Sequence, residues 1–241
     1  MRHKRDKIIA LPFAGGNRYC FDSIKKYVPQ NLDWITLELP GRGNRFKESL
    51  LENINDIVDD LLNQITPLIQ GCNYIIYGHS LGALLGYELT KRVIEKELKP
   101  PIHLFFTGRG APGFEQFEDK KSVLPKDLFW KEVNEIGGLT KDILDCEELL
   151  ELYYPIVKSD FRAIEDYEFH LTEKPFSIPI HICMGKEEIG EEKNKTSLTS
   201  MKAWKNETTS SCTFELLEGD HFFIFKNSEA MARKICQVAV R

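Results

Sequence analysis

The amino-acid sequence predicts an α/β protein with a mostly parallel, doubly wound sheet. Short, nearly continuous apolar segments recur along the chain, as is typical of strands covered by helices on both faces. Amphipathic helical segments separate them, which favours parallel strands joined by helical crossovers. Between about residues 111 and 175 the alternation stops, and short helical patterns rich in charged and aromatic residues replace it. We therefore expect one domain, residues 1–241, with a helical lid inserted at 111–175.

The expected elements follow from the period of the apolar residues. Strands are predicted at 7–11, 34–39, 74–77, 102–107, 178–184 and 212–217. Helices are predicted at 53–69, after residue 80, near 198–204 and at 228–239, with a weaker helical pattern at 20–28. Within the lid, helices are predicted at 126–136, 147–157 and 160–167, and the polar stretch 190–200 is predicted to be a mobile loop.

Composition and charge argue against several classes of function. The 241 residues are 42% hydrophobic and carry a net charge of −5, so there is no broad basic surface for nucleic acid. No run approaches the roughly 18 apolar residues that a membrane-spanning helix needs. The six cysteines are scattered without a C-x-x-C pair. This spacing favours reduced thiols in a cytoplasmic protein and argues against a metal site.

A catalytic serine is predicted where an apolar strand meets a helix. The stretch Gly78-His79-Ser80-Leu81-Gly82 fits the pattern G-x-S-x-G, with the predicted strand before it and a helical pattern after it. This context is that of a nucleophile elbow, in which a sharp turn lifts the serine hydroxyl above the sheet. The fold expected is therefore the α/β-hydrolase fold. The N-H of Leu81, at the start of the helix, is a candidate oxyanion donor.

The turn after the first predicted strand is a second candidate for oxyanion binding. It reads Pro12-Phe13-Ala14-Gly15-Gly16, and a proline with two glycines indicates unusual backbone angles. In this fold the loop after such a strand supplies the second oxyanion donor. We predict the N-H of Ala14, with that of Phe13 as the alternative. Arg42, after the second strand, could meet an anionic substrate, but a structural charge pair is the favoured interpretation.

The serine needs a general base, because its hydroxyl is a weak nucleophile at neutral pH. Of the six histidines, only His221 follows Ser80 in a loop after a late strand. The others lie in the N-terminal tail, the elbow, the strands or the lid. We predict His221 as the base, in the order serine, acid, histidine that this fold uses.

A carboxylate should orient the histidine from the end of the preceding strand. The loop Gly185-Lys186-Glu187-Glu188 offers two glutamates, of which Glu188 is favoured and Glu187 is the alternative. Asp160 and Asp220 are less favoured, the latter because it is adjacent to His221. A glutamate is one methylene longer than an aspartate, so its loop has to lie slightly farther from the ring.

Aromatic and aliphatic side chains of the lid are candidates for lining an acyl site. We single out Phe129, Tyr153 and Phe161, together with Phe13 from the oxyanion loop. The alternative for each lid residue is that it packs the lid onto the body of the protein.

Several of these motifs together resemble the type II thioesterases associated with nonribosomal peptide and polyketide synthases. The segments that carry the resemblance are Leu11–Gly16, Leu39–Gly43, the elbow, Thr107–Pro112, Tyr154–Phe161 and Gly219–Phe223. The resemblance implies a serine thioesterase that removes acyl groups from the phosphopantetheine arm of an acyl or peptidyl carrier protein, without a metal or tightly bound cofactor. We expect a monomer. The family usually has aspartate where this chain has Glu188.

Two alternatives remain open at this stage. The first is a small-molecule carboxylesterase or acyl-CoA hydrolase with the same fold and no carrier partner. The second is a non-catalytic module that binds carrier proteins, which the unusual Glu188 makes conceivable.

Overall fold

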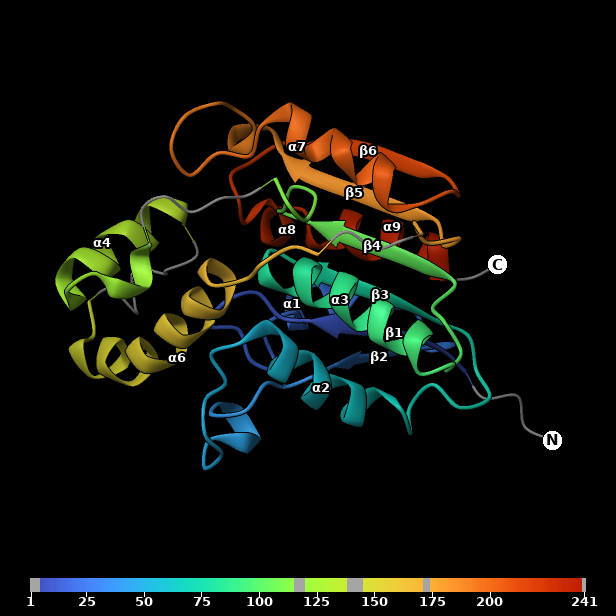
Figure 1. Cartoon of the computed structure of the whole chain (residues 1–241), viewed down its shortest axis with the longest axis horizontal. Coiled ribbons are helices and arrows are strands. Elements are labelled where there is room, and N and C mark those ends of the chain that lie inside the picture. Colours follow the sequence, from blue (N-terminus) through green and yellow to red (C-terminus); the bar gives the residue numbers. More distant parts are fainter. Residues whose placement is uncertain (1–4, 115–119, 138–144, 171–173, 240–241) are drawn as a thin grey trace.

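The computed structural model describes residues 5–114, 120–137, 145–170 and 174–239. Outside this description lie residues 1–4, 115–119, 138–144, 171–173 and 240–241. Gly138, of the predicted Gly137-Gly138 pair, is among them. The described strands form one parallel sheet in the order β2-β1-β3-β4-β5-β6 (Figure 1). They are β1 Asp6–Leu11, β2 Leu32–Thr36, β3 Tyr74–His79, β4 His103–Thr107, β5 Ile180–Gly185 and β6 Cys212–Leu217.

Helices cover both faces of this sheet, and each face has its own hydrophobic core. Because side chains alternate along a strand, Ile8 and Ala10 of β1 pack on one face while Ile9 and Leu11 pack on the other. The first face carries α1 (Asp22–Lys25), α8 (Phe223–Lys226) and α9 (Ser228–Ala239). The second carries α2 (Ile54–Ile65), α3 (Leu81–Glu95) and α7 (Leu198–Ala203). The predicted α/β class with a parallel, doubly wound sheet is confirmed.

The described residues between β4 and β5 include a helical insertion with its own small core. It contains the 3₁₀ helix η2 (Lys121–Val123), α4 (Lys126–Ile136) and α6 (Glu147–Glu165). Phe129, Trp130 and Val133 of α4 pack against Val157 of α6. Figure 1 shows α4 and α6 together at the end of the molecule toward which the strands point. The insertion therefore lies at the carboxyl ends of the strands, where open α/β sheets bind their ligands.

One prediction for the insertion is wrong. The helices expected at 147–157 and 160–167 are a single helix of 19 residues, α6. The polar pair Lys158-Ser159 does not end it, because the buried Ser159 hydroxyl donates to the carbonyl oxygen of Ile156, 2.9 Å away. A serine that bonds back to its own helix can be buried within that helix.

Other predicted boundaries also move, and three of them have a clear local reason. The helix α2 ends at Ile65, followed by Thr66 in helical angles, because Pro67 has no N-H with which to continue the helical hydrogen bonds. The strand β5 begins at Ile180, since Pro179 has no N-H for a sheet ladder. The strand β2 ends at Thr36 rather than at Leu39. Beyond it, the Glu38 carboxylate accepts the N-H groups of Arg18 and Asn44, so this segment serves the loops and not the sheet.

None of the helices in the described ranges is both long and apolar enough to cross a membrane.

Candidate active site

Ser80 lies at the sharp turn between β3 and α3 in a strained backbone conformation. Its φ is 55° and its ψ is −116°, a region that residues with a side chain rarely occupy. Its N-H donates to the Thr107 carbonyl oxygen of β4 at 2.8 Å, which ties the turn to the neighbouring strand. The Ser80 side chain, only partly buried, faces two cavities.

The two glycines of the motif are required by close approach of the backbone. A Cβ on Gly78 would lie 2.1 Å from the carbonyl oxygen of Gly82. A Cβ on Gly82 would lie 2.0 Å from the carbonyl oxygen of Leu11, at the end of β1. Any larger residue at either position would push α3 away from β1 and β3. The motif therefore sets the distance between Ser80 and the loop that follows β1.

Two backbone N-H groups near Ser80 are available to a ligand. Leu81 is the first residue of α3, and Ala14 follows β1 and lines both cavities beside Ser80. Within the described part of the chain, neither N-H donates a hydrogen bond to protein. Free N-H groups at a helix N-terminus and in a tight turn are the usual donors to a developing oxyanion.

His221 is held by Glu188 in a buried contact. The His221 Nδ1 and the Glu188 Oε2 are 2.8 Å apart, and the two side chains are 16% and 5% exposed. The other carboxylate oxygen, Oε1, accepts the Gly185 N-H at 2.6 Å. A carboxylate on Nδ1 keeps the proton there and leaves Nε2 as the acceptor. No hydrogen bond between the Ser80 hydroxyl and His221 is made among the described residues, as is common before substrate binds.

The loops that carry Glu188 and His221 are brought together by another glycine. A Cβ on Gly185, at the end of β5, would lie 2.3 Å from the carbonyl oxygen of Asp220. The Glu187 N-H also donates to the Gly219 carbonyl oxygen at 3.0 Å. After Gly185, the 3₁₀ helix η3 (Lys186–Glu188) turns the glutamate side chain back toward its own start. The carboxylate thereby contacts the Gly185 N-H and His221 Nδ1 at the same time.

The other acids considered from the sequence have different partners. Glu187 is exposed to solvent, in contrast to the buried Glu188. The Asp220 carboxylate accepts the N-H of Phe222 and pairs with Lys226. Asp160 is fully buried and paired with Arg42, which agrees with the structural charge pair favoured for Arg42.

His79, within the elbow, packs directly against His221. The ring centroids are 4.9 Å apart, and the His79 Nδ1 is 2.9 Å from the Thr107 hydroxyl. Complete burial holds the pKa of His79 well below its usual range, and the nearby His221 lowers this pKa further. His79 therefore stays neutral and presents an uncharged ring to His221.

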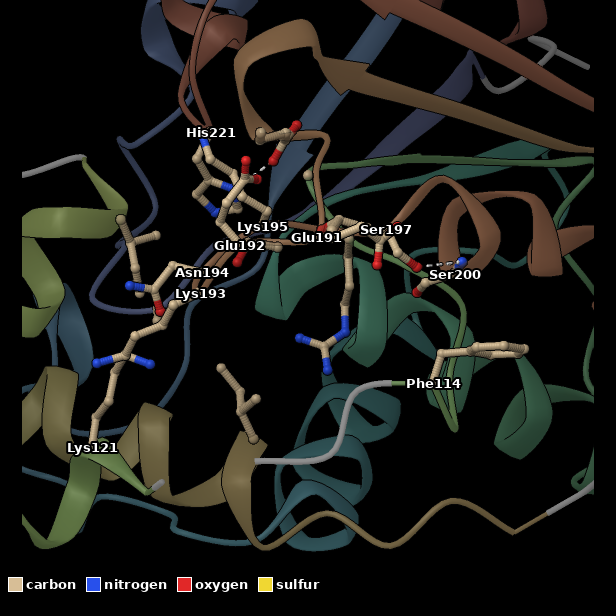
Figure 2. Close-up of a pocket in the computed structure, with 18 of the residues that line it drawn as sticks. Phe114, Lys121, Glu191, Glu192, Lys193, Asn194, Lys195, Ser197, Ser200 and His221 are labelled. Atoms are coloured by element: carbon tan, nitrogen blue, oxygen red, sulfur yellow. Dashed lines mark hydrogen bonds and ion pairs between the residues drawn. The ribbon is translucent and has the colours of Figure 1, made fainter. Parts of the chain in front are cut away.

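Two cavities meet at Ser80, and their walls differ in chemistry. Both are lined by Ala14, Ser80, Phe161 and His221. The smaller, about 290 Å³, has an apolar wall. The larger, about 640 Å³, has a charged wall from the loop after β5, with Arg109 and the buried Lys121. Figure 2 shows His221 on one side of this larger cavity and Lys121 on another.

The predicted substrate contacts divide between these walls and the core of the insertion. Phe13, Tyr153 and Phe161 line the smaller cavity. Phe129 lines neither cavity: it is fully buried between Trp130, Tyr154 and Phe161. For Phe129 the structure supports the alternative interpretation, packing within the insertion.

The structure adds lining residues that the sequence did not single out. These are chiefly Arg109 and Lys121 on the larger cavity and Asn17, Tyr19 and Val133 on the smaller one. The predicted loop 190–200 contributes residues 191–197 to the larger cavity, so its polar composition was a signal for the site. Among the residues described, no group of three or more His, Cys, Asp or Glu is arranged to hold a metal ion.

The site thus combines a strained serine, a histidine held by a buried carboxylate, and two free N-H groups. They lie where strands of a parallel sheet end, and this arrangement defines a serine hydrolase of the α/β-hydrolase fold. The Thioesterase domain family matches residues 6–238. The chain therefore belongs to the thioesterase family, and the prediction of an enzyme of this class is confirmed.

Individual relatives agree with this assignment. The gramicidin S biosynthesis protein GrsT of Aneurinibacillus migulanus is 29% identical over 231 residues, which cover 96% of this chain and 88% of GrsT. The crystal structure of ClbQ from the colibactin NRPS/PKS pathway superposes with a TM-score of 0.90 at 28% identity, covering 98% of this chain and 97% of ClbQ. The type II thioesterase YbtT from the yersiniabactin NRPS/PKS pathway shares the fold, with a TM-score of 0.83 at 22% identity over 98% of this chain and 94% of YbtT. The predicted resemblance to type II thioesterases is confirmed.

Proposed function

We propose that this chain hydrolyses acyl thioesters carried on the phosphopantetheine arm of acyl or peptidyl carrier proteins, and so clears such carriers for a synthase. The observation that carries the proposal is the buried Glu188–His221 pair beside the strained Ser80, where an apolar and a charged cavity meet. The names of its relatives, which belong to NRPS/PKS pathways and to gramicidin S biosynthesis, support the same substrate class.

In the proposed reaction Ser80 Oγ attacks the thioester carbonyl carbon while His221 Nε2 takes its proton. Glu188 keeps the Nδ1 proton in place and stabilises the imidazolium that forms. The N-H groups of Leu81 and Ala14 donate to the oxyanion of the tetrahedral intermediate. The carbon–sulfur bond then breaks, and His221 gives the proton to the leaving sulfur, which departs as the thiol. Water, deprotonated by His221, attacks the acyl-serine ester; the carbon–oxygen bond to Ser80 breaks, the proton passes from His221 to Ser80 Oγ, and the acid is released.

Glu188 is proposed to replace the aspartate that is usual in the family. Its two carboxylate oxygens have separate partners, His221 on one side and the Gly185 N-H on the other. A carboxylate held at both oxygens keeps one orientation, which the imidazole needs for proton transfer. These contacts argue against the non-catalytic alternative, because a module that only binds carriers has no need of them.

We assign the two cavities to the two parts of the substrate. The smaller, apolar cavity suits the acyl chain, with Phe13, Tyr153 and Phe161 as contacts. The larger cavity, with Arg109 and Lys121 in its wall, suits the polar phosphopantetheine arm. The insertion contributes to both, so we propose that residues 111–175 act as a lid within a single domain and that the carrier docks beside it.

We also propose a monomer in the cytoplasm that binds no nucleic acid. The free thiol state of all six cysteines and the net charge of −5 support this part of the proposal.

The test compares one acyl group on two thiols, a holo carrier protein and coenzyme A. We expect Ser80→Ala to abolish hydrolysis of both, and the matched variant Ser210→Ala, at an exposed serine, to behave as the wild type. A kcat/KM at least tenfold higher for the acyl carrier supports the carrier assignment. Equal or faster turnover of acyl-CoA would favour the small-molecule hydrolase. Full activity of Ser80→Ala would overturn the mechanism.

A further inference from the structure

A buried carboxylate of the helical insertion reaches the loop that carries the proposed oxyanion donor. Asp160 of α6 has no exposed surface. Its Oδ1 accepts from Arg42 Nη2 at 2.7 Å, and its Oδ2 accepts from Arg42 Nη1 at 2.6 Å. The same Oδ2 accepts the backbone N-H of Gly15 at 2.7 Å. One side chain thus joins the insertion, the loop after β2 and the loop after β1.

The Gly15 contact fixes one of the two peptide planes around Ala14. The segment 13–16 is a tight turn, closed by the Gly16 N-H donating to the Phe13 carbonyl oxygen at 2.8 Å. Gly15 has φ +77°, the left-handed value that a type II turn requires at its third residue. The peptide plane between Ala14 and Gly15 can flip with little displacement of the chain, which would give a type I turn. An acceptor on the Gly15 N-H opposes that flip.

The other peptide plane contains the oxyanion donor itself. The Phe13 carbonyl and the Ala14 N-H belong to one planar unit, so the turn hydrogen bond on the carbonyl also sets the direction of the N-H. A type I turn would keep that bond, but the flip that produces it would break the contact of the Gly15 N-H with Asp160. Asp160 therefore holds the whole turn, and with it the Ala14 N-H, in one position against α6. A Cβ on Gly15 would lie 2.9 Å from Val157 Cγ2, so α6 also packs closely against this turn.

We propose that Asp160 is a positioning residue, which acts through Gly15 to hold the Ala14 N-H toward the oxyanion. The proposal rests on the hydrolysis proposed above. The insertion then has a role beyond covering the site, because its helix α6 completes the oxyanion hole. Arg42 fixes the carboxylate for this task through two charge-assisted hydrogen bonds.

A purely structural role is the competing explanation, and α6 offers a matched control for it. Glu165 is also a nearly buried carboxylate of α6, and it accepts two backbone N-H groups, those of Lys121 and Ser122, at 2.7 and 3.0 Å. It touches the 3₁₀ helix η2 and not the turn at Ala14. Loss of either carboxylate should lower stability, but only loss of Asp160 should reach the chemical step.

The experiment compares Asp160→Asn and Asp160→Leu with Glu165→Gln and Glu165→Leu, assayed well below their melting temperatures. Asparagine keeps one acceptor oxygen, whereas leucine keeps none. We expect kcat to fall roughly 10-fold in Asp160→Asn and roughly 100-fold in Asp160→Leu, with KM changed less than threefold. These figures compare with the 10²- to 10³-fold effect of losing one oxyanion donor. Both Glu165 variants should keep kcat within about twofold of the wild type.

Two results would overturn the proposal. One is a folded Asp160→Leu protein with kcat near that of the wild type. The other is an equal loss of kcat in the Glu165 variants, which would show a general effect of loosening α6. If Asp160→Leu does not fold, the double variant Arg42→Met/Asp160→Leu, which leaves no unpaired buried charge, takes its place with the same expected loss. Failure of the proposed hydrolysis itself would appear separately, as a wild-type protein that does not hydrolyse the acyl carrier, and failure of its mechanism as full activity in Ser80→Ala.

Discussion

Two buried carboxylates flank the site, one in the body of the protein and one in the insertion, and they differ in what they hold. Glu188, after β5, contacts the histidine that takes up a proton in the proposed reaction. Asp160, in α6, contacts an arginine that is cationic throughout. Both were candidates for the acid of a triad. The difference shows that a buried acid near a serine is identified by its partner, not by its burial.

The two carboxylates also preorganise different parts of the site. Glu188 keeps a mobile ring in one tautomer and orientation, so its effect concerns proton transfer. Asp160 and Arg42 hold backbone, so their effect concerns the stability of the insertion and the direction of an N-H. Changes in the body should therefore reduce rate with little loss of stability, whereas changes at the Arg42–Asp160 pair should reduce stability as well.

The largest expected effect is the loss of kcat when Glu188, the carboxylate in the body of the protein, is replaced. Glu188→Gln removes the charge that stabilises the imidazolium and allows the wrong tautomer of His221, so kcat should fall by roughly 10³- to 10⁴-fold. The adjacent Glu187→Gln, at an exposed side chain, should keep kcat within about twofold. Steady-state hydrolysis of an acyl-carrier substrate measures both. Comparable losses in the two variants would contradict the assignment of the acid.

For the Arg42–Asp160 pair, which holds the insertion, the largest effect should be on the free energy of unfolding. Arg42→Met leaves the Asp160 carboxylate buried without its cation, which should lower the free energy of unfolding by about 3–5 kcal/mol. Arg42→Met/Asp160→Leu leaves neither charge and should lose less than the single variant. Urea denaturation measures both.

A neighbouring ion pair supplies the control for that measurement. Arg162, also in α6, pairs with Glu52 at 2.8 Å, but the two side chains are 55% and 51% exposed. Arg162→Met should therefore cost no more than about 1 kcal/mol. A double variant less stable than Arg42→Met would contradict the view that the unpaired charge is the main penalty.

Much of the site could be predicted from the sequence because its signals are local. The elbow glycines, the strand before Ser80 and the helix after it lie within one short segment. The order of serine, acid and histidine then selected Glu188 and His221 from few candidates. Exposure and contact now favour Glu188 over Glu187, a choice that spacing alone left open.

The rest depends on contacts between residues far apart in the chain. Nothing in the sequence around Asp160 indicates Arg42, 118 positions away, or the Gly15 N-H, 145 positions away. Phe129 is predicted from the sequence to line the acyl site, with packing as the alternative. The sequence cannot separate the two, because an aromatic residue on an amphipathic helix can face either a ligand or a neighbouring helix. Which of the two it faces is decided by the packing of α4 on α6.

A smaller loss of kcat is expected when the side chain of Glu188 is shortened by one methylene. In Glu188→Asp the shorter side chain cannot reach the Gly185 N-H and His221 Nδ1 together, so the His221 contact should lengthen. We expect kcat to fall about 10-fold, since misplacement of a catalytic group by about 1 Å can cost up to 10²-fold. Stability should change little, because the aspartate can still accept the Gly185 N-H. An unchanged kcat would show that η3 adjusts to aspartate, and that the glutamate is not matched to this turn.

The smallest effect concerns His79, which is fully buried and packs against His221. Burial lowers the pKa of His79 in the folded protein, so the unfolded chain binds a proton that the folded protein does not. This contribution is absent above the unfolded value near 6.5, and it lowers stability as the pH falls below that value. The slope approaches about 1.4 kcal/mol per pH unit for one proton. We expect His79→Gln, which cannot be protonated, to reduce the slope of unfolding free energy between about pH 6 and 5 by up to that amount, whatever its effect on absolute stability. Urea denaturation at several pH values measures the slope, and an identical slope in wild type and variant would show that His79 is protonated in the folded protein and that its burial against His221 does not keep it neutral.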